Sequence, residues 1–98
     1  MEVKRTLAFK EWIDGLRDLT GRARIQARIE RLADGNRGDH RNLSGGVSEM
    51  RVDVGPGYRV YYTQRGNTLL ILLVGGDKSS KAAQQNDIRK AQKLAENL

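Results

Sequence analysis

The chain has 98 residues, of which 18 are basic and 12 acidic, so its formal net charge at pH 7 is +6. It contains no cysteine and one histidine, which excludes a disulfide framework, a thiol nucleophile and a Cys-type metal site and disfavours a histidine-based one. The longest apolar run, residues 69–74, is far shorter than the ~20 residues that span a bilayer, and no signal-peptide core precedes it. We therefore expect one cytoplasmic domain that covers residues 1–98 and does not bind a membrane. Its positive charge favours an anionic binding partner.

The N-terminal part of the chain is predicted to form a short strand at residues 3–5 and then two helices. Thr6 is expected to cap a helix that runs to about Leu19, and Thr20 a second helix that runs to about Ala33. The short connection between them favours an antiparallel helix pair. The apolar faces of the two helices, at helical spacing, are Phe9, Trp12, Ile13 and Leu16 in the first and Ile25, Ile29 and Leu32 in the second.

Arginines follow the apolar stripe of the second helix. Arg24, Arg28 and Arg31 lie at i, i+4 and i+7, which predicts a basic ridge along one side of the helix. Such a ridge is either a solvated face, a set of phosphate contacts that positions a nucleic acid, or a surface covered by a partner protein.

Residues 47–62 read as a β-hairpin, because apolar and polar side chains alternate on both sides of a Gly-Pro-Gly turn at residues 55–57. A three-residue loop would place Val52 opposite Val60 and Met50 opposite Tyr62, which keeps all apolar side chains on one face. We therefore expect this register, with the other face of the hairpin open to solvent.

The polar face of this hairpin holds the candidate chemistry. In the expected register Asp53 lies opposite Arg59 and Arg51 lies opposite Tyr61. Two guanidinium groups, a carboxylate and a phenol would then converge, and such a patch suits a phosphodiester. The alternative interpretation is an exposed Arg59–Asp53 ion pair that contributes about 0–1 kcal/mol and has no further role.

The C-terminal part is predicted to supply the central strand and a last helix. Residues 68–74 are apolar on both sides, so they form the central strand, which Gly75 and Gly76 are expected to end. A helix should follow from about Ala82 or Asn86 to Leu98. The predicted fold is a small α+β domain whose antiparallel sheet packs, on one face, against the helices.

Basic residues follow the central strand. Lys78 and Lys81 could lie near Arg51 and Arg59, and no carboxylate cluster suggests a metal ion or another cofactor. Cleavage of RNA needs neither a metal ion nor another cofactor, because the RNA's own 2′-hydroxyl attacks the adjacent phosphorus once it is deprotonated. Fixed cations and a proton-transfer group are then sufficient, and several must act together.

Several motifs together resemble the RelE/ParE superfamily of type II toxins, most of all its HigB-like, or addiction module killer protein, branch. The resemblance covers the whole chain and includes the expected fold. It rests on Phe9 and Trp12 in the first helix, Glu49-Met50-Arg51, Gly57-Tyr58-Arg59 with Tyr61-Tyr62, the GGDKSS of Gly75 to Ser80, and Asp87-Ile88.

The resemblance implies roles for particular residues. Arg59 matches the arginine that contacts the scissile phosphate, Arg51 the basic residue of the preceding strand, and Lys78 lies near the basic residue after the central strand. Asp53 stands where RelE-like enzymes carry a second lysine, and no tyrosine near the C-terminus can act as general base. Tyr61 or Asp53 could take over proton transfer. Arg24, Arg28, Arg31 and Lys81 are candidate contacts to RNA or the ribosome.

The resemblance implies a toxin that cuts messenger RNA on the ribosome without a metal and is held inactive by a cognate antitoxin, a small helix-turn-helix protein. Operator DNA would be bound only through the antitoxin complex. Two alternatives remain open: a ParE-like inhibitor of DNA gyrase without nuclease activity, and a degenerate toxin that only binds its antitoxin.

Overall fold

The computed structural model describes all 98 residues and is built on one five-stranded sheet with strand order β1-β5-β4-β3-β2. β1 pairs with β5 in parallel, and the other neighbours are antiparallel, so the expected α+β fold is confirmed with a mixed sheet. The strands are β1 (Glu2–Arg5), β2 (His40–Asn42), β3 (Ser48–Val52), β4 (Tyr58–Arg65) and β5 (Leu69–Asp77).

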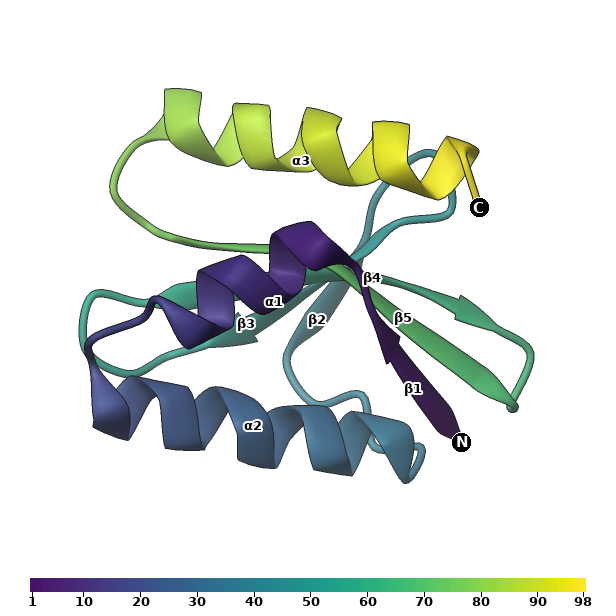
Figure 1. Cartoon of the computed structure of the whole chain (residues 1–98), viewed down its shortest axis with the longest axis horizontal. Helices are drawn as coiled ribbons and strands as arrows, with labels where there is room; N and C mark the ends of the chain where they lie inside the picture. The colour runs from purple at the N-terminus through teal and green to yellow at the C-terminus, as the bar shows by residue number, and fades with distance from the viewer.

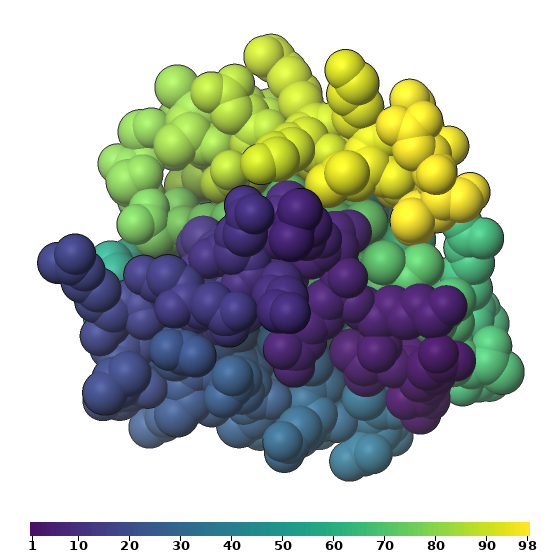
Figure 2. Space-filling model, viewed as in Figure 1, coloured from purple at the N-terminus to yellow at the C-terminus, as the bar shows by residue number.

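Helices cover both faces of the sheet, not one as the sequence suggested. They are α1 (Leu7–Asp14), α2 (Leu19–Ala33) and α3 (Lys81–Glu96). Figure 1 shows α3 on one side of the sheet and α2 on the other, with α1 and α2 running in roughly opposite directions. The space-filling view shows α3 and α2 as opposite borders of the face, with β1 and α1 crossing between them (Figure 2). No helix combines the length and apolar character needed to cross a membrane.

Two apolar clusters follow from this arrangement, because β5 has apolar side chains on both of its faces. The larger cluster joins α1 and α2 to the sheet through residues such as Phe9, Ile25 and Leu72. The smaller one joins α3 to the opposite face and includes Tyr61 and Ala91. The hairpin face that was expected to be open to solvent is therefore partly covered by α3.

Polar caps define where the helices begin. Thr6 caps α1, as predicted, by accepting a hydrogen bond of 3.0 Å from the backbone N–H of Phe9. α2 begins two residues earlier than expected, because Asp18, and not Thr20, is its cap. Ser80 caps α3 and starts it at Lys81.

The β3–β4 hairpin has a longer loop than predicted. Val52 pairs with Tyr58, and the connection spans residues 53–57, so the expected pairing of Val52 with Val60 was wrong by two positions. A shift by two keeps every side chain on its predicted face, since side chains alternate with a period of two. Gly57 adopts a positive φ of 83° in this loop, a conformation that glycine permits.

β5 does not end at Gly75, as the sequence suggested, but continues through both glycines to Asp77. A Cβ atom on Gly75 would lie 2.1 Å from the Trp12 ring, and one on Gly76 would lie 2.2 Å from the Asp87 carboxylate. The two glycines are therefore strand positions at which α1 on one side and α3 on the other approach the backbone closely.

Candidate functional site

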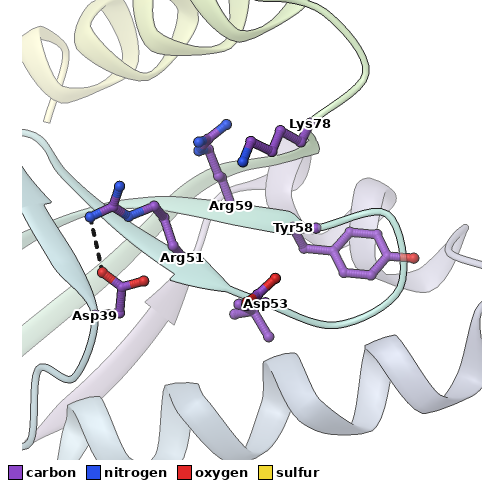
Figure 3. A pocket seen from close by; sticks show the side chains of 8 residues that line it. Asp39, Arg51, Asp53, Tyr58, Arg59 and Lys78 are labelled. Atoms are coloured by element: carbon purple, nitrogen blue, oxygen red, sulfur yellow. Dashed lines mark hydrogen bonds and ion pairs between the residues drawn. The ribbon is translucent and has the colours of Figure 1, made fainter.

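A pocket of about 190 Å³ lies where the β3–β4 hairpin meets the end of β5. We call it the hairpin pocket; Figure 3 shows it from close by. The structure brings four of the five predicted catalytic side chains to its wall. It is lined by Asp39, Arg51, Val52, Asp53, Gly57, Tyr58, Arg59 and Lys78.

Two arginines stand side by side at the base of this pocket. Arg51 on β3 pairs directly with Arg59 on β4, so both side chains leave the sheet on the face that α3 partly covers. The Arg51 side chain is 42% exposed, whereas that of Arg59 is only 12% exposed. Nη1 of Arg59 is fully buried and has no hydrogen-bond partner within the chain.

A buried carboxylate that the sequence reading did not single out as part of the site organises these arginines. Glu49 is two residues before Arg51 on the same face, and its side chain is 1% exposed. Its Oε1 lies 3.4 Å from Nε of Arg59 and 4.0 Å from Nε of Arg51, and its Oε2 accepts a hydrogen bond of 3.3 Å from Arg41. One negative charge is thus shared among three guanidinium groups, which leaves excess positive charge. The sequence offered one sign that Glu49 belongs to the site: it lies two residues before Arg51 and therefore on the same face of the strand.

Lys78 adds a third cation from a segment distant in sequence. Its backbone N–H donates a hydrogen bond of 3.0 Å to the carbonyl of Gly57, which ties the end of β5 to the hairpin loop. Its side chain points toward Arg59 (Figure 3) and takes part in none of the ion pairs of the structure. Like charges that converge without an intervening acid favour an anionic ligand.

The two acids of the pocket differ in their surroundings. Asp39 accepts a hydrogen bond of 3.0 Å from Arg51 and so offsets that charge (Figure 3). Asp53 lies exposed at the start of the hairpin loop and forms no ion pair. The expected contact between Asp53 and Arg59 is wrong, because Arg51 occupies the position opposite Arg59. No group of three or more metal-ligating side chains occurs in the structure.

Comparison with known proteins gives the family of the chain. The family model described as phage derived protein Gp49-like (DUF891) matches residues 11–96. This chain belongs to the Gp49-like family. The family is a toxin-antitoxin-like family of addiction-module toxins. An uncharacterized protein of Haemophilus influenzae is similar, with 45% identity over 98 residues, which cover all of this chain and 96% of that protein.

The tyrosines of this Gp49-like protein are poorly placed for proton transfer. Tyr61 does not line the pocket: it lies opposite Glu49, its side chain is fully buried, and its hydroxyl has no hydrogen-bond partner. Burial, reinforced by the Glu49 charge, raises the pKa of Tyr61 to about 12. The expected pairing of Arg51 with Tyr61 was therefore wrong.

Tyr58 lines the pocket, but its hydroxyl is already engaged. It donates a hydrogen bond of 2.7 Å to Asp18, the cap of α2, and this bond together with burial raises the pKa of Tyr58 to about 12. The backbone N–H of Gly21, followed by the Tyr58 hydroxyl, lowers the pKa of Asp18. The contact fastens the hairpin loop to α2, and the Tyr58 ring points away from Arg59 and Lys78 (Figure 3).

The remaining predicted contact residues of the Gp49-like chain lie outside the hairpin pocket. Arg24 and Arg31 are exposed on α2, and Lys81 is exposed at the start of α3. Arg28 donates a hydrogen bond of 3.0 Å to the backbone carbonyl of Arg51. Arg28 therefore holds α2 against β3 next to the site, so the predicted ridge is not uniformly solvated.

Proposed function

We propose that this protein is the toxin of a toxin–antitoxin pair and that it acts as a RelE/HigB-like endoribonuclease, which cuts messenger RNA on the ribosome without a metal ion. Its site of action would then be the cytoplasm, and its partner a cognate antitoxin. The observation that carries the proposal is the convergence of Arg59 and the unpaired Lys78 at one open pocket, where the guanidinium of Arg59 has a nitrogen, Nη1, without a partner inside the chain (Figure 3). A phosphate oxygen would supply the hydrogen-bond acceptor that this guanidinium lacks.

The charges of the hairpin pocket match one phosphodiester. Its lining has three cations and two carboxylates, so the net charge of the lining is +1: Arg51, Arg59 and Lys78 against Asp39 and Asp53. A phosphodiester with one negative charge would compensate the cation that remains. As the substrate's 2′-oxygen bonds to phosphorus, a second negative charge develops on the phosphorane, and we expect Arg59 and Lys78 to stabilise it.

Each proton of this reaction needs a carrier. The 2′-hydroxyl loses its proton to a base as the new O2′–P bond forms. The P–O5′ bond then breaks, leaving a cyclic 2′,3′-phosphate and a 5′-oxygen that must gain a proton. We assign the base role to Asp53, the one acid of the pocket without an ion-pair partner, and the acid role to the ammonium group of Lys78. Positioning and charge supply the rest, with about 10²–10³-fold expected from one such cation.

The test combines growth arrest with cleavage mapping on translating ribosomes. Expression of the wild-type chain should arrest growth and produce cut messenger RNA, and Arg59→Ala should abolish both while it remains folded by circular dichroism. Arg65→Ala, at the exposed end of β4 and not among the residues that line the pocket, is the charge-matched control and should behave as wild type. Growth arrest without RNA cuts, combined with inhibited supercoiling by gyrase, would overturn the nuclease proposal in favour of a ParE-like activity.

A further inference from the structure

A second depression of the surface lies between one side of α3 and the end of β2 with the segment that follows it. Its volume is about 430 Å³, and we call it the α3 groove. None of its lining residues lines the hairpin pocket. It is lined by Arg41, Asn42, Leu43, Ser44, Gln85, Ile88, Arg89 and Gln92.

The lining of the α3 groove has the chemistry of a nucleotide site. It contains two arginines and no acid, together with amides, a hydroxyl and two apolar side chains. Arg89 is exposed and forms no ion pair. Guanidinium groups bind phosphates, amides read base edges, and apolar side chains such as those of Leu43 and Ile88 can pack against the face of an unstacked base.

The groove is held in shape by contacts across it. The amide nitrogen of Gln92 on α3 donates hydrogen bonds to the backbone carbonyl and to the hydroxyl of Ser44, at 3.2 and 2.9 Å. Asn42 accepts a hydrogen bond of 3.0 Å from Ser48, which fixes the amide. The segment after β2 is therefore fastened to α3 before any ligand arrives, which lowers the entropic cost of binding.

Glu49 connects the groove to the hairpin pocket. Its Oε2 binds Arg41, which lines the groove, and its Oε1 faces Arg59, which lines the pocket. The two guanidinium groups are separated by little more than the width of one carboxylate and its two contacts, a span that a single nucleotide can bridge. One arginine of each depression thus contacts the same carboxylate.

We propose that the α3 groove binds the nucleotide next to the scissile phosphodiester of a single-stranded RNA, with Arg89 on its flanking phosphate and the amides beside its base. This inference rests on the proposed ribonuclease function and extends it to a second subsite. An acidic protein segment could pair with the two arginines of the groove. Binding of such a segment would not explain the amides that line the groove or the contact of Glu49 with both the groove and the hairpin pocket.

The experiment uses the full chain and a short single-stranded RNA that carries a 2′-O-methyl group on every nucleotide, because this probe binds but cannot be cut by 2′-hydroxyl attack. Affinity is measured against salt concentration for wild type, Arg89→Ala and the control Arg65→Ala. Arg89→Ala should reduce the slope of log affinity against log salt by about 0.7, the value for one phosphate contact to a single strand. It should also reduce the efficiency of cleavage on translating ribosomes. Arg65→Ala should change neither quantity.

The outcomes separate this inference from the proposed function. If wild type cuts RNA but Arg89→Ala matches Arg65→Ala in both binding and cleavage, the groove is not an RNA subsite, although the nuclease assignment stands. If wild type cuts RNA only on the ribosome and does not bind the free probe, the cleavage efficiencies of Arg89→Ala and Arg65→Ala are compared instead. Equal efficiencies would then show that the groove is not an RNA subsite. If wild type neither cuts nor binds RNA, the proposed function falls and the subsite with it. Weakened antitoxin binding by Arg89→Ala with unchanged RNA handling would assign the groove to an acidic protein segment and overturn the inference.

Discussion

Nε of Arg59 lies 3.4 Å from Oε1 of Glu49, a carboxylate whose side chain is only 1% exposed. The inner edge of the guanidinium is therefore held by a charge that no ligand can reach. The small exposed part of the side chain, 12%, lines the hairpin pocket. A buried acid thus orients the cation that we assign to the phosphate, and this arrangement connects the stability of the chain to its activity.

Glu49→Gln should destabilise the fold measurably. The substitution leaves the largely buried guanidinium of Arg59 without a charged partner, and an uncompensated buried group costs about 1–3 kcal/mol. Asp39→Asn is the matched control, since it removes a carboxylate from an exposed pair with Arg51 and should cost only about 0–1 kcal/mol. Urea unfolding of both variants measures the difference. Equal losses of stability would show that Glu49 is not the organising charge.

Asp53→Asn should lower RNA cleavage by about 10²–10⁴-fold, because it removes the proposed base from the pocket while retaining the shape of the side chain. Tyr61→Phe should change cleavage only a few-fold, since this buried hydroxyl does not reach the pocket. Single-turnover rates of wild type and the two variants decide between them. The reverse ranking of the two variants would return the base role to Tyr61.

The three tyrosines should all ionise above the ordinary phenol value of 10. Burial raises the pKa of Tyr62, and the pKa values of Tyr58 and Tyr61 rise to about 12. Below pH 10 both the folded and the unfolded chain keep these protons. Above it the unfolded chain loses them first, so the free energy of unfolding should fall as the pH rises from 10 to about 12. Absorbance of the phenolate and urea unfolding across this range check both statements. Tyr61→Phe should reduce the pH dependence of the free energy of unfolding. If that pH dependence stays the same in the variant, the raised pKa of Tyr61 is contradicted.

Much of the site could be predicted from alternation alone. Arg51 and Arg59 occupy the same face because the period of two survives a register error of two residues. The exact register could not be predicted, because Asp53 and Val54 continue the alternating pattern although they belong to the loop. Lys78 was expected near the arginines because it follows the central strand, and the hydrogen bond to Gly57 brings it there.

Other features left little signal in the sequence. β2 has only three residues, all polar, so no apolar alternation marks it as a strand in the sequence. The β4–β5 register shifts between Tyr61 and Tyr62, and Leu73 and Val74 consequently both contribute to the α3 cluster. Such a bulge is set by packing on both faces of the sheet and has no marker of its own here. Glu49 enters the sequence analysis only as part of the Glu49-Met50-Arg51 motif, because its burial depends on α3 covering that face of the sheet.

Gly75→Ala should destabilise the fold more than Gly76→Ala does, although the two residues are adjacent in β5. A methyl group at Gly75 meets the Trp12 ring, which is packed against Phe9 and Tyr58 and cannot turn aside, so overpacking should cost about 1–3 kcal/mol.

At Gly76 the methyl group meets the Asp87 carboxylate instead. Burial already raises the pKa of Asp87, and its side chain can rotate away from the strand, so this clash is relieved more cheaply. The double variant Gly76→Ala/Asp87→Ala should therefore recover the stability that Gly76→Ala loses relative to Asp87→Ala alone. Thermal unfolding of the four variants and wild type measures these differences. If the Asp87 substitution restores nothing, the close approach of α3 to β5 is not what requires glycine at Gly76.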